Sequence, residues 1–236
     1  MQITPLAQAF NLELTPAQLE TLARFQALLI EWNAKFNLTG VTDPAEITVK
    51  HFADSLSVAL AFQDAERARS LELIDVGSGA GFPGVPLAIV FPHWRVTLLE
   101  ATGKKVSFLN HLVTELPLDN CRAIHSRAED LAHKPQHRSM YDVAVARAVA
   151  HLPTLLEYLL PLVRVGGIAI AQKGREVNEE IESSATALKI LGGKLREVIP
   201  VKLPNEDGRH LIVLKKDSET PREYPRRAGI PERKPL

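Results

Sequence analysis

The feature that most constrains the fold of this chain is a regular alternation of short apolar runs and helical patterns over residues 71–191. The apolar runs predict strands at 71–76, 95–99, 121–125, 141–146 and 167–172. The segments that follow them predict helices at 84–91, 104–116, 128–133, 153–163 and 176–191. This alternation predicts an α/β fold, with a mostly parallel sheet, right-handed crossovers and helices on both faces.

The two ends of this region have different patterns. Residues 1–70 are expected to form an N-terminal helical cap, with one helix beginning at Thr15-Pro16 and a second running from 44 to 62. The second helix is expected to turn four apolar side chains inward, namely Ile47, Phe52, Leu56 and Leu60. Two runs at 194–202 and 210–215 have no helix between them, so we expect an antiparallel hairpin at one sheet edge.

Composition excludes several classes of protein. Apolar residues make up 45% and charged residues 24% of 236 residues, as in an ordinary globular chain. The single cysteine, Cys121, excludes an internal disulfide and a cysteine-cluster metal site, and no metal is expected. No apolar run approaches the ~18 residues of a membrane span, and the first residues lack a signal-peptide pattern. We expect a cytoplasmic monomer that binds no membrane.

Charge is balanced overall but uneven along the chain. Lys plus Arg and Asp plus Glu both number 28, which excludes a protein that binds nucleic acid through a large net charge. Residues 217–236 form a basic, proline-rich tail, which is expected to contain no helix and no central strand. We expect this tail to be disordered or to lie on the surface with basic side chains outward. Arg226 and Arg227 are its candidate RNA contacts, and it is not expected to affect cofactor binding.

The segment Asp75-Val-Gly-Ser-Gly-Ala-Gly-Phe-Pro-Gly84 connects the first predicted strand to the first predicted helix of the α/β region. Glycines in such a turn allow positive φ and a close approach of a ligand to the backbone. A dinucleotide fingerprint starting at Gly77 would need glycine where Phe82 stands. The pattern D-x-G-x-G-x-G instead resembles the class I S-adenosyl-L-methionine-dependent methyltransferases, which have a Rossmann-like fold. Gly77, Gly79 and Gly81 are therefore candidate cofactor contacts, although a tight turn alone would also need glycine.

Acidic residues follow the second and third predicted strands. Glu100 ends the second strand, where a carboxylate can accept hydrogen bonds from two ribose hydroxyls. Ala128 and Glu129 follow the third strand, at the position where methyltransferases contact the adenine edge. The alternative interpretations are a solvated surface charge for Glu100 and a helix-start carboxylate for Glu129.

Basic residues end the fourth and fifth predicted strands, at the crevice where such sheets bind ligands. Amino-group methyltransferases resemble one another in an Asp/Asn-Pro-Pro-Tyr/Phe run after the fourth strand, and this chain instead has Arg147 there. Methylation of pyrimidine C5 needs a cysteine nucleophile, but Cys121 lies inside a predicted strand. Arg147 is the candidate catalytic residue, with a structural ion pair as the alternative. Lys173 is a candidate phosphate contact or an ordinary strand-end lysine.

Several motifs together resemble one family over nearly the whole chain. They are Phe36-Asn-Leu-Thr-Gly40, Lys50-His-Phe-Ala-Asp-Ser-Leu56, Val76 to Gly84, Arg147-Ala148, Lys173-Gly174 and Tyr224 to Leu236. They are similar to signatures of the bacterial small-subunit ribosomal RNA guanine-N7 methyltransferases, also called glucose-inhibited division protein B. The resemblance implies methylation of N7 of one guanine in 16S ribosomal RNA near the decoding site, on naked RNA or a small-subunit assembly. It implies cofactor contacts at Gly77, Phe82, Glu100, Ala101, Thr102, Ala128, Glu129 and Arg147.

The chemistry of this reaction needs few protein groups. Guanine N7 carries a free lone pair, so no general base is needed before methyl transfer. Placement of N7 in line with the methyl group can then contribute up to roughly 7–11 kcal/mol. Arg147 would position the guanine or the cofactor carboxylate. A small-molecule methyltransferase and a non-catalytic binding module are the alternatives at this stage, since a fold alone does not specify a substrate.

Overall fold

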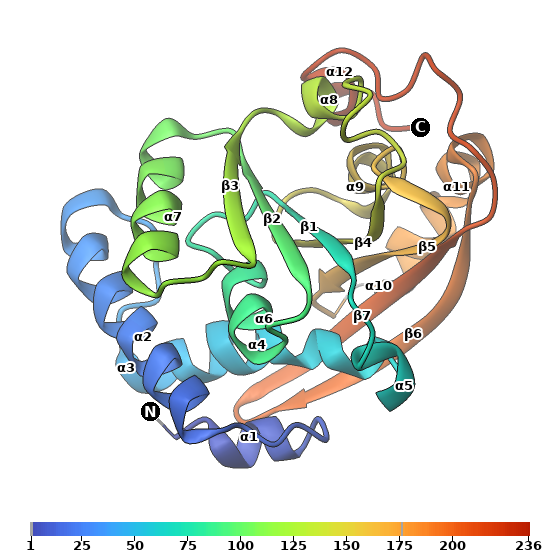
Figure 1. Cartoon of the computed structure of the whole chain (residues 1–236). Helices are drawn as coiled ribbons and strands as arrows, with labels where there is room; N and C mark the ends of the chain where they lie inside the picture. The colour runs from blue at the N-terminus through green and yellow to red at the C-terminus, as the bar shows by residue number, and fades with distance from the viewer. Residues whose placement is uncertain (1, 176) are drawn as a thin grey trace.

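A computed structural model describes residues 2–175 and 177–236, and its centre is a seven-stranded sheet (Figure 1). The strands are β1 (Glu72–Val76), β2 (Arg95–Glu100), β3 (Cys121–His125), β4 (Tyr141–Arg147), β5 (Val163–Lys173), β6 (Gly193–Leu203) and β7 (Glu206–Lys216). Their spatial order is β3-β2-β1-β4-β5-β7-β6. The first five strands are parallel, and β7 is antiparallel to both β5 and β6. The predicted α/β fold and the antiparallel edge hairpin are confirmed.

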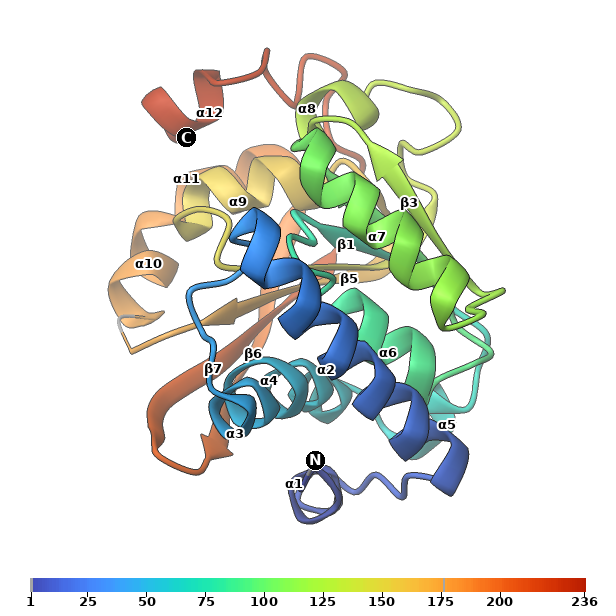
Figure 2. The ribbon, with the colours of Figure 1, turned by 90° about the vertical axis from the view of Figure 1, so that its left-hand side faces the viewer.

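The N-terminal segment packs on one face of this sheet together with two helices of the α/β region. Its helices are α1 (Thr4–Gln8), α2 (Pro16–Phe36), α3 (Pro44–Ile47), η1 (Thr48–Ala53), α4 (Asp54–Leu56), η2 (Ser57–Ala61) and α5 (Asp64–Arg67). Figure 2 shows α2 lying across α6 (Gly84–Val90) and α7 (Gly103–Glu115). Phe25 of α2 and Phe52 of η1 share one buried cluster with the sheet residues Leu73 and Val96. The predicted helix start is confirmed, since Thr15 forms a capping box with Gln18.

The opposite face of the sheet is covered by helices from the second half of the chain. These are α8 (Ala128–Leu131), α9 (Leu152–Leu159), α10 (Val177–Ser183), α11 (Ala185–Leu191) and α12 (Ile230–Arg233). Helix α9 is central, because it contacts each of the other four as well as β4 and β5. Alternate residues of the strands face the two layers, so Leu73 belongs to the first cluster and Ile74 to the second.

Two of the helices expected from the sequence are interrupted. The segment 44–61 changes from α-helix to π-helix, back to α-helix and then to a 3₁₀ turn. Ile47, Phe52 and Leu56 are buried as expected, but Leu60 is only half-buried. Most of 47–59 is buried, so its apolar pattern does not mark a single face. The expected helix 176–191 divides at Ser184 into α10 and α11, and Glu176 lies outside the described residues.

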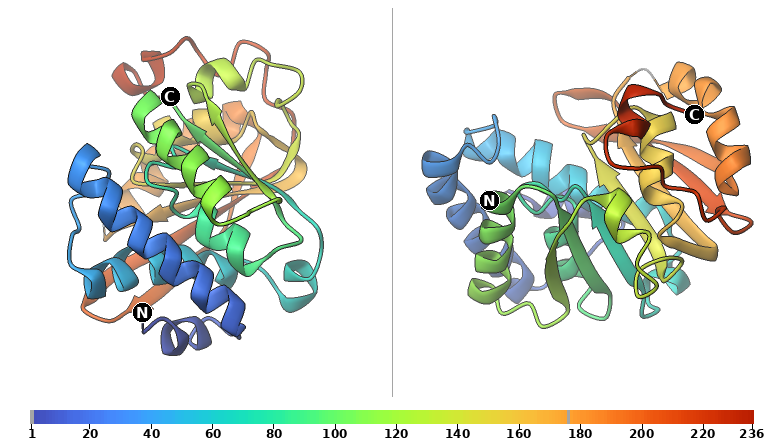
Figure 3. Two further views of the ribbon diagram at one scale, coloured as in Figure 1. Left: turned by 60° about the vertical axis from the view of Figure 1, so that its left-hand side comes forward. Right: turned by 90° about the horizontal axis from the view of Figure 1, so that it is seen from above.

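The C-terminal tail differs from its prediction. It contains the short helix α12, which tolerates Pro231 because the first turn of a helix does not use that backbone N–H. Arg226 is not directed outward, because it pairs with the buried Glu157. Figure 3 shows this segment, coloured red, lying against the helices of the second layer. The tail is therefore an ordered part of the fold.

Among residues 2–175 and 177–236, no helix is both long and apolar enough to cross a membrane.

Candidate functional site

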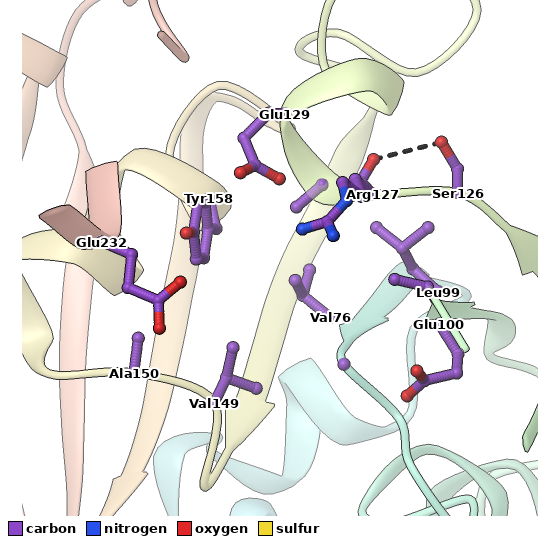
Figure 4. A pocket seen from close by; sticks show the side chains of 13 residues that line it. Val76, Leu99, Glu100, Ser126, Arg127, Glu129, Val149, Ala150, Tyr158 and Glu232 are labelled. Carbon is purple, nitrogen blue, oxygen red and sulfur yellow. Dashed lines mark hydrogen bonds between the residues drawn. The ribbon is translucent and has the colours of Figure 1, made fainter. Parts of the chain in front are cut away.

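A cavity of about 240 Å³ lies at the carboxyl ends of four neighbouring parallel strands. Its walls come from the segments that follow β1, β2, β3 and β4, and from α9 and α12. The lining residues are Val76, Gly77, Leu99, Glu100, Ala101, Ser126, Arg127, Ala128, Glu129, Val149, Ala150, Tyr158 and Glu232 (Figure 4). This is the end of a parallel sheet where ligands are expected, because the loops that follow the strands converge there.

The glycine turn at the end of β1 contributes Gly77 to the cavity lining. Gly77, Gly79 and Gly81 have φ of +74°, +57° and +93°, a conformation that favours glycine. A Cβ at Gly77 would lie 2.6 Å from the Val149 side chain, so the turn and the segment after β4 are in close contact. A Cβ at Gly79 would meet nothing closer than the Gly77 carbonyl at 3.8 Å. The backbone at Gly79 is therefore open to approach by a ligand.

Asp75 on β1 anchors the far end of this turn. Its Oδ2 accepts a hydrogen bond from the N–H of Gly84 at 2.9 Å. Within the described residues, its Oδ1 is buried without a hydrogen-bond partner. Burial raises the pKa of Asp75 to about 7, and the Gly84 N–H and the Arg147 charge oppose that rise. The carboxyl group therefore holds the turn from inside the protein and does not face the cavity.

Glu100 connects the second strand to the turn. Its Oε2 accepts from the N–H of Gly79 at 3.0 Å, and its Oε1 accepts from the N–H of Thr102 at 2.8 Å. The residue is 7% exposed and lines the cavity. Each carboxylate oxygen has two lone pairs, so Glu100 can still accept two hydrogen bonds from a ligand. Its fixed position makes it unlike a solvated surface charge.

Ala128 and Glu129 form another side of the cavity at the start of α8. Both side chains are buried, and Glu129 Oε1 accepts from the N–H of Gly229 at 3.1 Å. Gly229 lies 100 residues away in the tail, so the tail determines part of this carboxylate's environment. Of the predicted cofactor contacts, Gly77, Glu100, Ala101, Ala128 and Glu129 line one cavity.

Five other predicted contacts lie outside the lining of this cavity, namely Gly79, Gly81, Phe82, Thr102 and Arg147. The ring of Phe82 is 3% exposed and stacks on Phe25 with a centroid separation of 4.9 Å. A Cβ at Gly81 would also meet the ring of Phe25, at 3.3 Å. Thr102 is exposed and precedes α7. Phe82 and Gly81 thus support the turn from the core side.

Arg147 at the end of β4 belongs to a second cluster. Its Nη1 donates to Asp54 Oδ2 at 2.9 Å and to the Lys50 carbonyl at 2.8 Å. Its Nη2 lies 3.4 Å from His51 Nδ1, and its guanidinium carbon lies 5.3 Å from the ring centre of Phe82. Burial and the Arg147 charge lower the pKa of His51 to about 4. The ion pair considered for Arg147 is present, and its partner Asp54 was not among the predicted site residues.

The remaining predicted residues have other partners. Lys173 donates to Glu180 at 2.5 Å and to the Ala150 carbonyl at 2.7 Å, so it braces the loop after β4. Arg226 is bound to Glu157, whereas Arg227 is exposed. Of the candidate RNA residues, Arg227 is thus the one whose side chain is presented to solvent.

Eight residues of the cavity wall were not predicted from the sequence, and Figure 4 shows how they surround the space. They are Val76, Leu99, Ser126, Arg127, Val149, Ala150, Tyr158 and Glu232. Ser126 and Arg127 directly precede the predicted pair Ala128-Glu129, so the strand-end rule could have included them. No sequence signal identifies Tyr158 or Glu232. Glu232 reaches the cavity through the fold of the tail, and Tyr158 projects from α9, whose pattern predicts only a core helix.

The surroundings of Cys121 and of the possible metal ligands bear on cysteine and metal chemistry. Cys121 is buried in β3, and burial raises the pKa of its thiol to about 12. A thiol of this kind is not a nucleophile at neutral pH. In the part of the chain that the structure describes, no three His, Cys, Asp or Glu side chains are placed to hold a metal ion.

Comparison with known proteins gives one consistent family. A family model described as rRNA small subunit methyltransferase G (GidB) matches residues 18–212. Two relatives named ribosomal RNA small subunit methyltransferase G, from Acetivibrio thermocellus and a Roseiflexus species, are each 46% identical to this chain. Each match covers 98% of this chain, together with 93% of the first relative and 97% of the second.

Solved structures share the fold at low sequence identity. A SAM-dependent methyltransferase from Aquifex aeolicus superposes with a TM-score of 0.53 and 17% identity, covering 73% of this chain and 93% of its own. The 16S rRNA (adenine(1408)-N(1))-methyltransferase from Catenulisporales acidiphilia has a TM-score of 0.53 and 16% identity, covering 66% and 89%. These likenesses identify a class I methyltransferase fold.

Proposed function

Because the chain belongs to the rRNA small subunit methyltransferase G family, we propose that it methylates N7 of one guanine in 16S ribosomal RNA. The family establishes an S-adenosyl-L-methionine-dependent enzyme that methylates small-subunit ribosomal RNA. The proposal adds the target atom and the residues that carry the reaction. The main support for the placement of the cofactor is the cavity over β1, β2, β3 and β4, where Gly77, Glu100 and Glu129 meet.

The residues of this cavity fit an adenosyl cofactor. Glu100 retains acceptor capacity for two ribose hydroxyls after its bonds to Gly79 and Thr102. Ala128 provides a small apolar wall for a base, and Glu129 provides an acceptor beside it for an exocyclic amine. The open backbone at Gly79 leaves room for the rest of the molecule. S-adenosyl-L-methionine supplies a methyl group on a positively charged sulfur, which a neutral nitrogen lone pair can attack directly.

The side chains near the cavity are suited to positioning rather than to proton transfer. Burial and nearby carboxylates raise the pKa of Tyr158 to about 12, so this phenol stays neutral at physiological pH. A guanine N7 acceptor has no proton to lose, so no general base is required. We assign Arg147 to positioning the guanine, because Asp54 and the Lys50 carbonyl hold its guanidinium at the end of β4. Its charge excludes it as a proton acceptor.

The substrate and the state of the enzyme complete the proposal. We propose 16S ribosomal RNA or a small-subunit assembly as the substrate and a cytoplasmic monomer as the enzyme. Arg227 is the proposed RNA contact of the tail, since its side chain is exposed. Lys173 is assigned to supporting the Ala150 loop through Glu180.

The test is methyl transfer from radiolabelled S-adenosyl-L-methionine to 16S ribosomal RNA, to small subunits and to a pool of small metabolites. We expect label in RNA, at a guanine that becomes sensitive to aniline cleavage as N7-methylguanine does. Glu100→Gln should weaken cofactor binding by about 1.5–3 kcal/mol, measured by calorimetry. The control is Glu223→Gln, at an exposed carboxylate of the tail. Label in metabolites alone would contradict the RNA assignment, and unchanged affinity of the Glu100 variant would contradict the cofactor placement.

A further inference from the structure

After β7, the C-terminal tail runs back over the helices of the second layer and ends in α12, near α8 (Figures 1 and 3). Glu232 of α12 lines the cavity. Arg138, which follows α8, binds the first half of the tail. Its guanidinium donates to the carbonyls of Thr220 and Tyr224, both at 2.8 Å. Just before the tail, the buried Lys216 at the end of β7 donates to the carbonyl of Leu191 at 2.7 Å and to the hydroxyl of Thr220. These contacts hold the backbone of the tail along a defined route.

The strongest attachment is between Arg226 and Glu157 of α9. Glu157 has a fully buried carboxylate, which accepts from the Arg226 backbone N–H at 2.5 Å. The same carboxylate accepts from Arg226 Nη2 at 2.7 Å and from Nε at 3.0 Å. A buried carboxylate with a two-pronged arginine partner is among the stronger polar contacts in proteins. The attachment places the next residues of the tail directly over α8 and α9.

Beyond this attachment, the tail contacts residues of the cavity itself. The N–H of Gly229 donates to Glu129, and the carbonyl of Pro231 accepts from the buried hydroxyl of Thr154 at 3.0 Å. The next residue, Glu232, lines the cavity beside Ala150 and Tyr158 (Figure 4). The tail thus donates a hydrogen bond to Glu129, a proposed cofactor contact, and its Glu232 forms part of the cavity wall.

We propose that residues 229–232 are part of the cofactor site. Gly229 positions the Glu129 carboxylate, and Glu232 contacts the bound cofactor. The inference rests on the proposed placement of the cofactor in this cavity. The ligand class is an adenosyl sulfonium, which carries a positive charge and several hydrogen-bond donors. A carboxylate at Glu232 is complementary to both features, because it is negatively charged and only accepts hydrogen bonds.

The test compares cofactor affinity in four full-length or shortened proteins, by calorimetry. One protein ends at Ala228, which removes Gly229 and Glu232 but keeps the attachment between Arg226 and Glu157. The second is Glu232→Ala, and the third is the control Glu223→Ala, which removes an exposed carboxylate of the same tail outside the cavity lining. The fourth is Glu100→Gln. Circular dichroism establishes that each protein is folded.

We expect about a tenfold loss of affinity in the shortened protein and about a threefold to tenfold loss for Glu232→Ala, comparable to one ordinary hydrogen bond. Glu223→Ala should stay within about twofold of the unmodified chain, as expected for a surface substitution. Hydrogen exchange at the amides of 229–234 should also slow when S-adenosyl-L-methionine binds to the unmodified protein.

Two different failures are distinguishable. If the shortened protein and Glu232→Ala bind normally while Glu100→Gln does not, the role of the tail is wrong and the cofactor placement stands. If Glu100→Gln also binds normally, the cofactor lies elsewhere and both proposals are wrong. If the shortened protein does not fold, Glu232→Ala and the hydrogen exchange of the unmodified chain decide the question, because neither removes part of the tail.

Discussion

At the residue scale, Arg147 and Asp54 form the polar contact that most directly connects the N-terminal segment to the end of β4. The side chains are 12% and 3% exposed, and their atoms approach to 2.9 Å. Arg209 of β7 also lies 4.0 Å from the other oxygen of Asp54. The pair therefore holds Arg147 in one position beside Phe82, where it cannot move freely to follow a ligand.

Arg147→Ala should reduce methyl transfer at least tenfold while it changes S-adenosyl-L-methionine affinity less than about threefold, if the side chain acts on the guanine. Asp54→Asn should produce a smaller loss in the same direction, because it weakens the ion pair but keeps the side-chain shape. Single-turnover rates and calorimetry separate the two effects. The control is Arg164→Ala, which breaks a partly exposed pair with Asp142 and should leave both values unchanged. Equal losses of rate and affinity would instead assign Arg147 to the cofactor.

Asp75 predicts a pH dependence of stability. Its pKa is about 7 in the folded protein and near 3.8 when exposed, so the folded state binds more protons between these values. The stability from Asp75 is therefore fully present below about pH 4 and is lost as pH rises through 7, with a maximum effect of about 4 kcal/mol. Asp75→Asn should reduce the loss of stability between pH 5 and pH 8, because asparagine does not ionise. Urea unfolding of both proteins at the two pH values measures this loss. If the free energy of unfolding changes equally in the two proteins, the raised pKa of Asp75 is contradicted.

At the scale of elements, the tail and α9 depend on one another. Glu157 is fully buried on α9, and among residues 2–175 and 177–236 Arg226 donates every hydrogen bond that its carboxylate accepts. Pro225 and Pro231 are also buried, so the tail covers part of the second layer. A segment that is basic and rich in proline can therefore be structural when one of its charges has a buried partner.

Arg226→Ala should destabilise the protein by about 3–5 kcal/mol, because it leaves a buried carboxylate without its cation. Arg227→Ala is the matched control, since the neighbouring side chain is exposed, and it should change stability by less than about 0.5 kcal/mol. Chemical unfolding of both variants gives the comparison. Equal stabilities would mean that the Glu157 contact contributes little to the folded state.

At the scale of the whole molecule, the N-terminal segment and the sheet share a continuous core. Ile3, Phe25 and Phe52 belong to the same buried cluster as Leu98 and Val213. The sequence division at residue 70 therefore separates two stretches that bury each other's apolar surface. The division into a helical cap at 1–70, a methyltransferase domain at 71–216 and a tail at 217–236 stays a prediction about organisation along the chain.

We expect one cooperative unfolding transition for the whole chain, because neither side of this shared core is complete without the other. S-adenosyl-L-methionine at about 100 times its dissociation constant should stabilise the folded state by about 2.7 kcal/mol. Calorimetry with and without the cofactor measures both effects. Residues 71–236 alone should bind a hydrophobic dye strongly, since the apolar surface that α2 and η1 cover on one face of the sheet and on α6 and α7 would be exposed. Two separate transitions in the full chain would contradict the shared core.

The strand and helix periods, together with the turn that begins at Gly77, were sufficient to predict the α/β fold and part of the cavity wall. Residues at strand ends, such as Glu100 and Glu129, could be predicted because parallel strands bring their carboxyl ends to one edge. Asp54, Tyr158 and Glu232 could not be predicted in this way. Their roles depend on contacts between segments far apart in the chain, such as the bond from Gly229 to Glu129. Local periodicity reports which face of an element is buried, but only tertiary packing decides which distant side chain meets it, and that is why the tail's place at the cavity came from the structure.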